Sequence, residues 1–448
     1  AAAMGVGAVY CFGRWLQRPY WVEAMIGAAT LGLAELCKFT LLVLYALLPL
    51  IWAIYRWPER KTMQRLDWLR QGGMLSASLL VSLCIVNCGY MFEDTLMPLE
   101  DFRFQTTMFT GYRSVQDIPP EGANRFMGTW LGKVPVPLPA NMVQGIDTQR
   151  FDFERGVPSY LRDEWADRGW WYYYLYALAI KIPLGTWCLM LLAIGTSIFG
   201  GGYSVSWRDE MVMLAPLFVL LVFVSSQTGF AVHSRYVIPV LPFLFVWTSK
   251  IARVFRMRSV SRCQLAIGGM ALFALVWSVG SSAAVYPHSL SYFNELVGGP
   301  KGGPKYLLDS NIDWGQDLLY LKDWLDGHSE VKLDGLAYWG SFPATLAGVP
   351  NTPFPDRNPN TEYRRCDRSE SQPAPRPGWY AVSVNYLYER SGQYRYFLRL
   401  EPTAMAGYSI YIYHITLDEA NRVRREMGIA ELPGADKGKR GTGDEHGY

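Results

Sequence analysis

Long apolar blocks dominate the first two thirds of this chain of 448 residues, half of which are hydrophobic. A helix needs about 17–25 residues to cross the hydrocarbon layer of a membrane, and most of the blocks reach that length. The predicted spans lie at about residues 2–13, 20–37, 39–55, 72–90, 182–199, 211–229, 236–249 and 264–286. The sequence therefore predicts a multi-spanning α-helical membrane protein.

The positions of the basic residues orient these predicted spans. Connections 56–70 and 250–262 are the richest in Lys and Arg, and such loops face the cytoplasm. If both connections lie on the cytoplasmic side, Arg14 and Arg18 lie on that side as well. Four segments then fall outside: the turn at Lys38, the long loop 91–181, the short turn 230–235 and the chain after residue 286.

The pattern predicts five regions. These are N-terminal transmembrane helices, about four in number (1–90), an extracytoplasmic loop with an interfacial helix (91–181), about four further transmembrane helices (182–286), a C-terminal extracytoplasmic α/β domain (287–432) and a disordered tail (433–448). The net charge of +3 argues against nucleic acid as a partner. The chain starts on Ala1 without a charged leader, so we expect it to begin partway through a larger protein.

Two basic positions are predicted at the outer membrane edge. Lys181 follows an aromatic stretch at 165–180, which we interpret as an interfacial helix before the span at 182–199. Arg235 and Tyr236 open a span that Pro239 and Pro242 should bend. Both cations could simply anchor helix ends. Together they could instead hold a lipid phosphate, with Arg as a planar fork and Lys as a point charge.

Several segments resemble bacterial multi-spanning glycosyltransferases of the GT-C class, particularly the dolichyl-phosphate-mannose protein mannosyltransferases and aminoarabinose transferase-like proteins. The segments that carry the resemblance are GLAELCKFTLLVLY (32–45), ALAIKIPLG (177–185), HSRYVIPVLP (233–242) and YFNELVGGPKGGPKYLLDSNIDWGQDL (292–318). The resemblance implies sugar transfer from a polyprenyl-phosphate donor to a lipid, glycan or protein acceptor, outside a bacterial inner membrane. It implies Arg235 and Lys181 for the cationic role at the donor phosphate, and Tyr236, next to Arg235, is the third candidate for binding this phosphate.

The catalytic carboxylate of that class is not evident in this sequence. It belongs to the first extracytoplasmic loop, and Glu23 and Glu35 lie within an apolar block and do not match. Asp163 and Glu164 in the outer loop are substitute candidates for the catalytic carboxylate, although acidic residues in such a loop usually only contact water. The chain is then either the C-terminal part of a longer enzyme or a degenerate relative. A non-catalytic membrane scaffold or glycan-binding protein is the alternative function, whereas a transporter would show internal repeats.

The C-terminal region has the pattern of a small α/β domain. Strands are predicted at 306–309, 333–341, 379–388 and 408–415, with an amphipathic helix at 314–327 that presents Leu318, Leu321 and Leu325 on one face. The first strand, the helix and the second strand would form one βαβ unit. Loop 91–164 is predicted to be extended and turn-prone, with an acceptor-binding or lid role.

The stretch DSNIDWGQD places Asp309, Asn311 and Asp313 two residues apart, as in a calcium loop. Position 6 of such a loop would be Trp314 instead of glycine, and position 12 would be Tyr320 instead of glutamate, so the EF-hand reading fails. We interpret Asp313 as a helix N-cap. Asp309 and Asp313 remain a possible acceptor or ion site, and a divalent metal stays possible although no metal-ligand motif is present.

Overall fold

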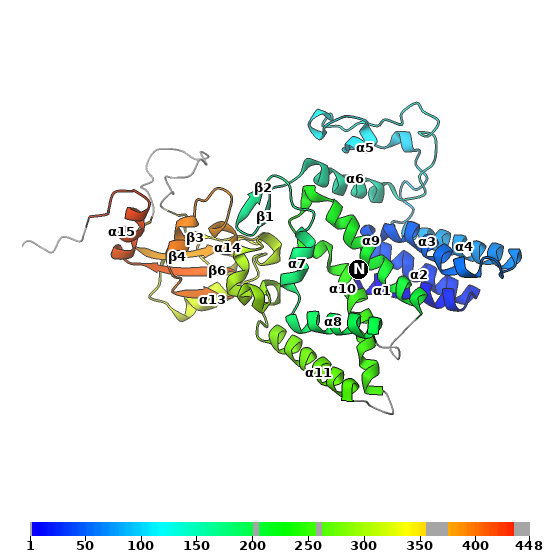
Figure 1. Cartoon of the computed structure of the whole chain (residues 1–448). Coiled ribbons are helices and arrows are strands. Elements are labelled where there is room, and N and C mark those ends of the chain that lie inside the picture. The colour runs from blue at the N-terminus through cyan, green and yellow to red at the C-terminus, as the bar shows by residue number, and fades with distance from the viewer. Residues whose placement is uncertain (1, 200–205, 257–261, 355–374, 434–448) are drawn as a thin grey trace, which may run out of the picture. The chain divides into compact units, whose positions relative to one another are not determined.

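The computed structural model describes residues 2–199, 206–256, 262–354 and 375–433 and divides into two compact units (Figure 1). The first unit comprises Ala1–Ser159 and Ala166–Ala283 and is built of helices. The second comprises Tyr160–Trp165 and the chain from Ala284 onward, and it contains a four-stranded sheet. Residues 160–165, which we assigned to the long outer loop, thus belong to the second unit.

Every predicted apolar block falls on a helix of the first unit. The helices are α1 (Ala2–Gln17), α2 (Trp21–Cys37), α3 (Val43–Arg56), α4 (Arg65–Gly89), α6 (Ala140–Arg155), α7 (Tyr173–Lys181), α8 (Leu184–Phe199), α9 (Trp207–Ser226), α10 (Leu241–Thr248) and α11 (Arg262–Ala283), with the short α5 (Thr107–Thr110) in the long loop. A 3-10 turn, η1 (Phe39–Leu42), leads into α3, and η6 (Ser234–Tyr236) and η7 (Ile238–Val240) lead into α10.

Five helical segments in the described part of the chain are long and apolar enough to cross a membrane. They are Thr40–Glu59, Arg65–Gly89, Trp207–Ser226, Ser234–Phe255 and Arg262–Ala283. A sixth arises if α7 and α8 count as one broken span, since their axes differ by 108° at the break before Leu184. The helices α1 and α2 have 16 and 17 residues and are shorter than these segments. The predicted number of eight spans therefore stays a prediction.

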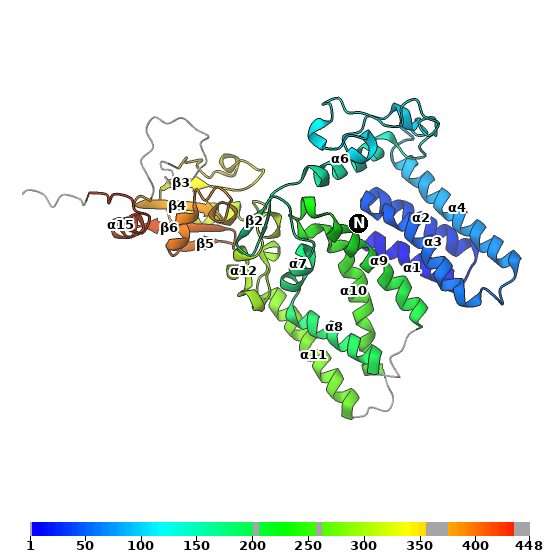
Figure 2. The same cartoon turned by 45° about the horizontal axis from the view of Figure 1, so that its top comes forward.

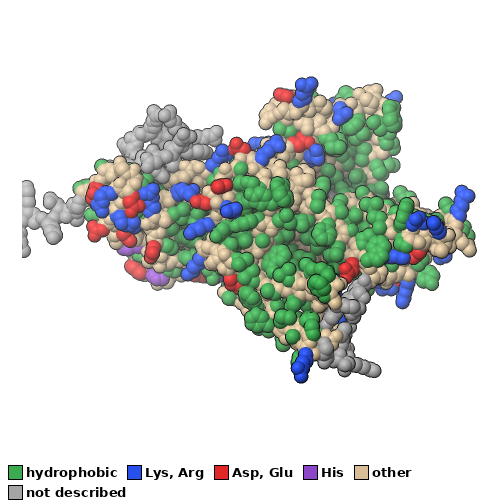
Figure 3. All heavy atoms as spheres, in the orientation of Figure 1, with side chains coloured by type: hydrophobic (Ala, Val, Ile, Leu, Met, Phe, Trp, Pro, Cys, Tyr) green, Lys and Arg blue, Asp and Glu red, His purple; other side chains and the backbone are tan. Residues whose placement is uncertain are grey.

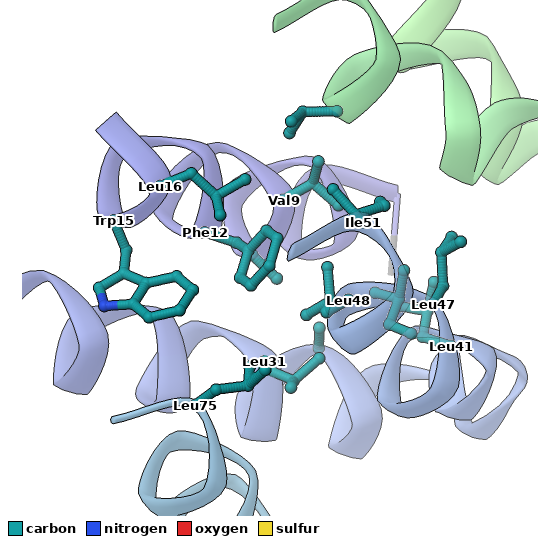
Figure 4. Close-up of a cluster of buried hydrophobic side chains, with 14 of the residues drawn as sticks. Val9, Phe12, Trp15, Leu16, Leu31, Leu41, Leu47, Leu48, Ile51 and Leu75 are labelled. Atoms are coloured by element: carbon teal, nitrogen blue, oxygen red, sulfur yellow. The ribbon is translucent and has the colours of Figure 1, made fainter. Parts of the chain in front are cut away.

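The first unit has a hydrophobic core and many exposed apolar side chains. Side chains of α1, α2, α3 and α4, such as Phe12, Leu31, Leu48 and Leu75, pack together inside it (Figure 4). On the face shown in Figure 3, hydrophobic side chains also cover much of the outer surface of the helices. Phe273 of α11, for example, is 68% exposed. Apolar surface of this extent indicates a lipid-facing exterior.

The long outer loop contains more regular structure than predicted. The helix α6 covers sixteen residues of a segment that we expected to be extended, and two short strands, β1 (Ser159–Leu161) and β2 (Glu164–Ala166), pair with each other. The three prolines at 135, 137 and 139 end directly before α6, so they constrain only the approach to the helix. The predicted interfacial helix at 165–180 is shorter than expected, because α7 begins only at Tyr173.

The second unit packs helices on both faces of a mixed sheet of order β3-β4-β6-β5 (Figures 1 and 2). The strands are β3 (Leu333–Ala337), β4 (Gly378–Ser383), β5 (Ala404–Ala406) and β6 (Ile410–Ile415), and only β3 and β4 are parallel. Alternate residues of β4 point to opposite faces: Tyr380 and Val382 pack with α15 (Leu417–Glu426), and Ala381 packs with α13 (Leu318–Gly327).

Several details of the predicted C-terminal domain are wrong. The predicted strand 379–388 ends at Ser383, because the next residues form the short helix α14 (Val384–Leu387). Residues 306–309 form no strand, because 3-10 turns occupy Gly303–Lys305 and Asp309–Asn311, so the first strand of the βαβ unit does not exist. The helix α13 begins at Leu318, four residues later than expected. Its predicted apolar face is confirmed, since Leu318 and Leu321 are buried and Leu325 packs against the same cluster. The predicted disordered tail (433–448) lies outside the described residues except for its first residue.

Candidate functional site

The helices of the first unit carry a polar network at one end. Arg56 at the end of α3 pairs with Glu59 at 3.1 Å, and Arg208 at the start of α9 pairs with the same carboxylate at 2.6 Å. Arg56 also donates to the backbone oxygen of Leu16 in α1 at 2.5 Å. Lys250, after α10, pairs with Glu210 of α9 at 2.8 Å. Glu59 and Lys250, from the two loops predicted to be cytoplasmic, therefore both pair with the first turn of α9.

The other ends of α3 and α9 border an apolar cavity of about 360 Å³. Its apolar lining comes from Leu42 and Val43 at the start of α3 and from Phe223 and Val224 at the end of α9. A face of α6 completes the wall, with Ile146, Gln149, Arg150 and Phe153 at the i, i+3, i+4, i+7 spacing of one helix side. A cavity of this size and lining suits an apolar chain.

Two cations meet at Tyr236, which also lines the apolar cavity. The Nζ atom of Lys38 lies 5.3 Å from the centre of the Tyr236 ring, and the Cζ atom of Arg235 lies 5.6 Å from the same centre. Ring faces attract cations, so the tyrosine can hold both. Burial, and then the charge of Arg235, lower the pKa of the Lys38 ammonium. An anion beside Tyr236 would reduce the repulsion between the positive charges of Lys38 and Arg235.

A second, polar cavity of about 340 Å³ shares Arg150, Phe153 and Gln227 with the apolar one. Its lining includes four arginines: Arg113, Arg150, Arg155 and Arg168. Among the described lining residues, Glu154 is the one carboxylate. The two cavities together thus offer an apolar chamber next to a strongly basic one.

The structure only partly groups the predicted phosphate-binding residues. Arg235 and Tyr236 lie together in η6, and α7, which ends at Lys181, packs against η6 and α9. The partner that the sequence analysis missed is Lys38, which we had used only to mark an outer turn. The arginines of the polar cavity were also missed. The helical spacing of residues 146, 149, 150 and 153 was the signal that could have revealed this side of α6.

The described structure leaves the catalytic carboxylate unassigned. Glu154 accepts hydrogen bonds from the Thr107 backbone N–H at 2.7 Å and from Arg150 at 3.1 Å. Asp163, our substitute candidate, belongs to the second unit and pairs with Arg395 at 2.7 Å. Glu164 is exposed in β2. Glu35 is only 2% exposed in α2, and neither of its carboxyl oxygens accepts a hydrogen bond from a described residue.

Asp309 and Asp313 lie in the second unit, in a turn that leads towards α13. Asp309 adopts a left-handed conformation with φ of +59°, and its backbone N–H donates to Asn385 Oδ1 at 2.7 Å. Asp313 is fully buried beside the hydroxyls of Ser383 and Ser409. Burial is the main cause that raises the pKa of Asp313 to about 7.

The predicted helix cap at Asp313 is wrong. Asp317 is the residue that precedes α13, and the Asp313 carboxylate accepts instead from the Gly315 backbone N–H at 3.0 Å. Gln316 accepts from the Trp314 backbone N–H, so the capping-box partner is also absent. Within the residues that the structure describes, no three His, Cys, Asp or Glu side chains gather as a metal site. Whether Asp309 and Asp313 bind an acceptor or ion stays a prediction.

No family model, curated protein or solved structure matches this chain.

Proposed function

We propose that the chain acts in a membrane glycosyltransferase that moves a sugar from a polyprenyl-phosphate donor to an acceptor on the extracytoplasmic side. The observation that carries the proposal is the pair of cavities in the first unit that share lining residues, with Lys38 and Arg235 at Tyr236, which lines the apolar one. A polyprenyl phosphate matches this arrangement of an apolar cavity beside positive charges, because its apolar chain ends in an anionic head. The segment resemblance to GT-C enzymes supports the same substrate class.

The donor would place its prenyl chain against Phe223 and Val224 and its phosphate near Lys38 and Arg235. The sugar would then extend into the arginine-lined cavity. During transfer an acceptor oxygen forms a bond to the anomeric carbon, and the bond from that carbon to the phosphate oxygen breaks. The phosphate leaves with the electron pair, and cations aimed at this developing charge lower the barrier. The proton of the acceptor hydroxyl passes to a base that the described residues do not identify.

Binding of a short prenyl phosphate tests the proposed site directly. We would measure the affinity of the full chain in nanodiscs for geranylgeranyl phosphate and for geranylgeraniol, which lacks the phosphate. Arg235→Ala and Lys38→Ala should each weaken phosphate binding by about 10-fold or more, since a hydrogen bond to a charged group contributes about 1.5–3 kcal/mol, and should leave alcohol binding unchanged. Val224→Trp should weaken both ligands by filling the apolar cavity.

Two matched variants control for general damage. Arg60→Ala removes an exposed arginine near the opposite end of α3, and Val222→Trp adds a ring to the exposed side of α9, where Val222 is 68% exposed. Both should bind geranylgeranyl phosphate as the unaltered chain does. Equal affinity for the phosphate and the alcohol would refute the phosphate site, and so would full phosphate binding by Arg235→Ala and Lys38→Ala.

A non-catalytic protein that binds the same lipid is the second candidate, and the hydrogen-bonded state of Glu154 favours it. Proteoliposomes with labelled polyprenyl-phosphate sugars separate the two functions. We expect transfer of label to an acceptor, reduced about 100-fold in Arg235→Ala if the arginine stabilises the leaving phosphate. Donor binding without transfer, by the native full-length protein and with every donor tried, would leave the non-catalytic function standing.

A further inference from the structure

The second unit contains a cavity of about 670 Å³ that the proposed sugar transfer does not use. It lies where β5, the turn into β6 and the short helix α12 (Gly299–Gly302) meet the segment around His288 (β5 and α12 are labelled in Figure 2). Its side-chain lining includes His288, Lys301, Thr403, Met405, Tyr408 and Tyr411. This volume falls within the range of about 300–1,000 Å³ that is usual for small-molecule sites.

His288 is held in one orientation at the wall of this cavity. Its Nδ1 atom lies 2.9 Å from Oδ1 of Asp317, a carboxylate that is fully buried. Tyr320 packs on the imidazole with 4.6 Å between ring centres, and Tyr408 packs edge-on at 5.5 Å. Because the carboxylate accepts a hydrogen bond, we assign a proton to Nδ1. The nitrogen left for a ligand is Nε2.

Asp317 is itself fixed by the turn between β5 and β6. Its Oδ2 atom accepts hydrogen bonds from the backbone N–H groups of Tyr408 and Ser409, each at 3.1 Å. This approach requires glycine at position 407, which has φ of +57° and where a Cβ would lie only 2.2 Å from the Asp317 carboxyl carbon. The turn, Asp317 and His288 therefore form one rigid support for the cavity wall.

The chemistry of the lining selects a class of ligand. Lys301 contributes a positive charge, and the described lining residues include no carboxylate. Tyr408 and Tyr411 present aromatic surface together with hydroxyl groups, and Thr403 adds another hydroxyl. An ammonium group binds oxyanions, and the unprotonated Nε2 of an imidazole accepts a hydrogen bond from a hydroxyl group. Tyrosine combines an apolar ring with a polar tip that can meet the hydroxyls of a sugar.

We propose that this cavity binds a saccharide that carries an anionic group, either a carboxylate or a phosphate. Lys301 contacts the oxyanion, Nε2 of His288 accepts a hydrogen bond from a sugar hydroxyl, and the two tyrosines contact the sugar ring. The proposal is independent of the lipid site in the first unit, because its ligands are water-soluble and none of its residues lines the other cavities.

Calorimetric titration of the full chain in detergent micelles tests this site with glucose 1-phosphate, glucuronate, glucose and inorganic phosphate. At least one of the two anionic sugars should bind at least 10-fold more tightly than both glucose and inorganic phosphate, and the stronger one identifies the anion. Lys301→Gln should weaken that ligand about 10-fold, as expected for loss of about 1.4 kcal/mol. Lys305→Gln, a nearby exposed lysine outside the lining, should bind normally.

His288→Asn separates ligand binding from support of the fold. The asparagine side-chain N–H group can replace Nδ1 as the donor to Asp317 but provides nothing in place of Nε2. We expect a melting temperature close to that of the unaltered chain and affinity reduced about 10-fold. A lower melting temperature with unchanged affinity would show that His288 only supports the turn. Equal binding of glucose and both anionic sugars, or normal binding by Lys301→Gln, would also overturn the proposal.

Discussion

Asp313 shows how one buried carboxyl makes stability depend on pH. Burial, with a smaller effect of the nearby charge of Asp317, raises the pKa of Asp313 to about 7 in the folded chain. In an unfolded chain the pKa of Asp is about 3.9. The folded state then binds more protons than the unfolded state between these values. As far as Asp313 is concerned, stability should therefore be highest below about pH 4, fall as the pH rises to about 7, and change little above that.

Asp313→Asn should remove this dependence, because the amide stays neutral. At pH 8 we expect the free energy of unfolding of the variant to exceed that of the unaltered chain by about 1–4 kcal/mol, which raises its melting temperature. Near pH 4 the two proteins should melt at the same temperature. Thermal melts of the full protein between pH 4 and 8 measure this difference. Asp309→Asn is the matched control, since a half-buried turn position with positive φ tolerates Asn. An unchanged pH profile in Asp313→Asn would contradict the assignment.

At the scale of elements, the junction of α6 with the turn Thr228–Phe230 holds the two cavities of the first unit in place. The backbone N–H of Val157 donates to the Gly229 oxygen at 2.9 Å, and a Cβ on Gly229 would lie 1.8 Å from the Phe153 carbonyl oxygen. Gly229→Ala should therefore push α6 away from the turn. Both cavities share Phe153 and Gln227 near this contact.

We expect Gly229→Ala to lower the melting temperature and to weaken binding of both geranylgeranyl phosphate and geranylgeraniol. Gly195→Ala provides the comparison, because a Cβ there meets no atom within 4 Å and the residue lies inside α8. That substitution should be neutral or stabilising by up to about 1 kcal/mol. Binding and melting of Gly229→Ala equal to those of Gly195→Ala would show that the close contact is not needed.

The success of sequence-based prediction differs from one element to another for physical reasons. The apolar helices of the first unit were predictable because hydropathy is a local property of each segment. The polar helix α6 was missed, since it has only a narrow apolar face and follows three prolines. The helix α15 was also missed, although Thr416 and Glu419 form a capping box whose T-x-x-E spacing is visible in the sequence.

At the scale of the whole molecule, the predicted orientation gives a direct test. The proposed site needs loop 91–181 and the second unit on the extracytoplasmic side, with connection 56–70 in the cytoplasm. In a chain whose native cysteines are replaced by Ser, Tyr112→Cys and Asp418→Cys should react with a membrane-impermeant maleimide in intact spheroplasts. Lys61→Cys should react only after lysis. Labelling of Lys61→Cys in intact spheroplasts would show that the predicted orientation is wrong.

The sequence alone determined where the apolar helices of this protein lie, because the hydropathy of a run of nonpolar residues does not depend on any distant part of the chain. It also identified Arg235 and Tyr236 as candidates. Only the tertiary structure showed that Lys38 joins them at one ring, and that Asp317 holds His288 at a cavity wall. These groupings join residues from distant parts of the chain. Their proximity depends on how helices and turns pack, which local patterns do not encode.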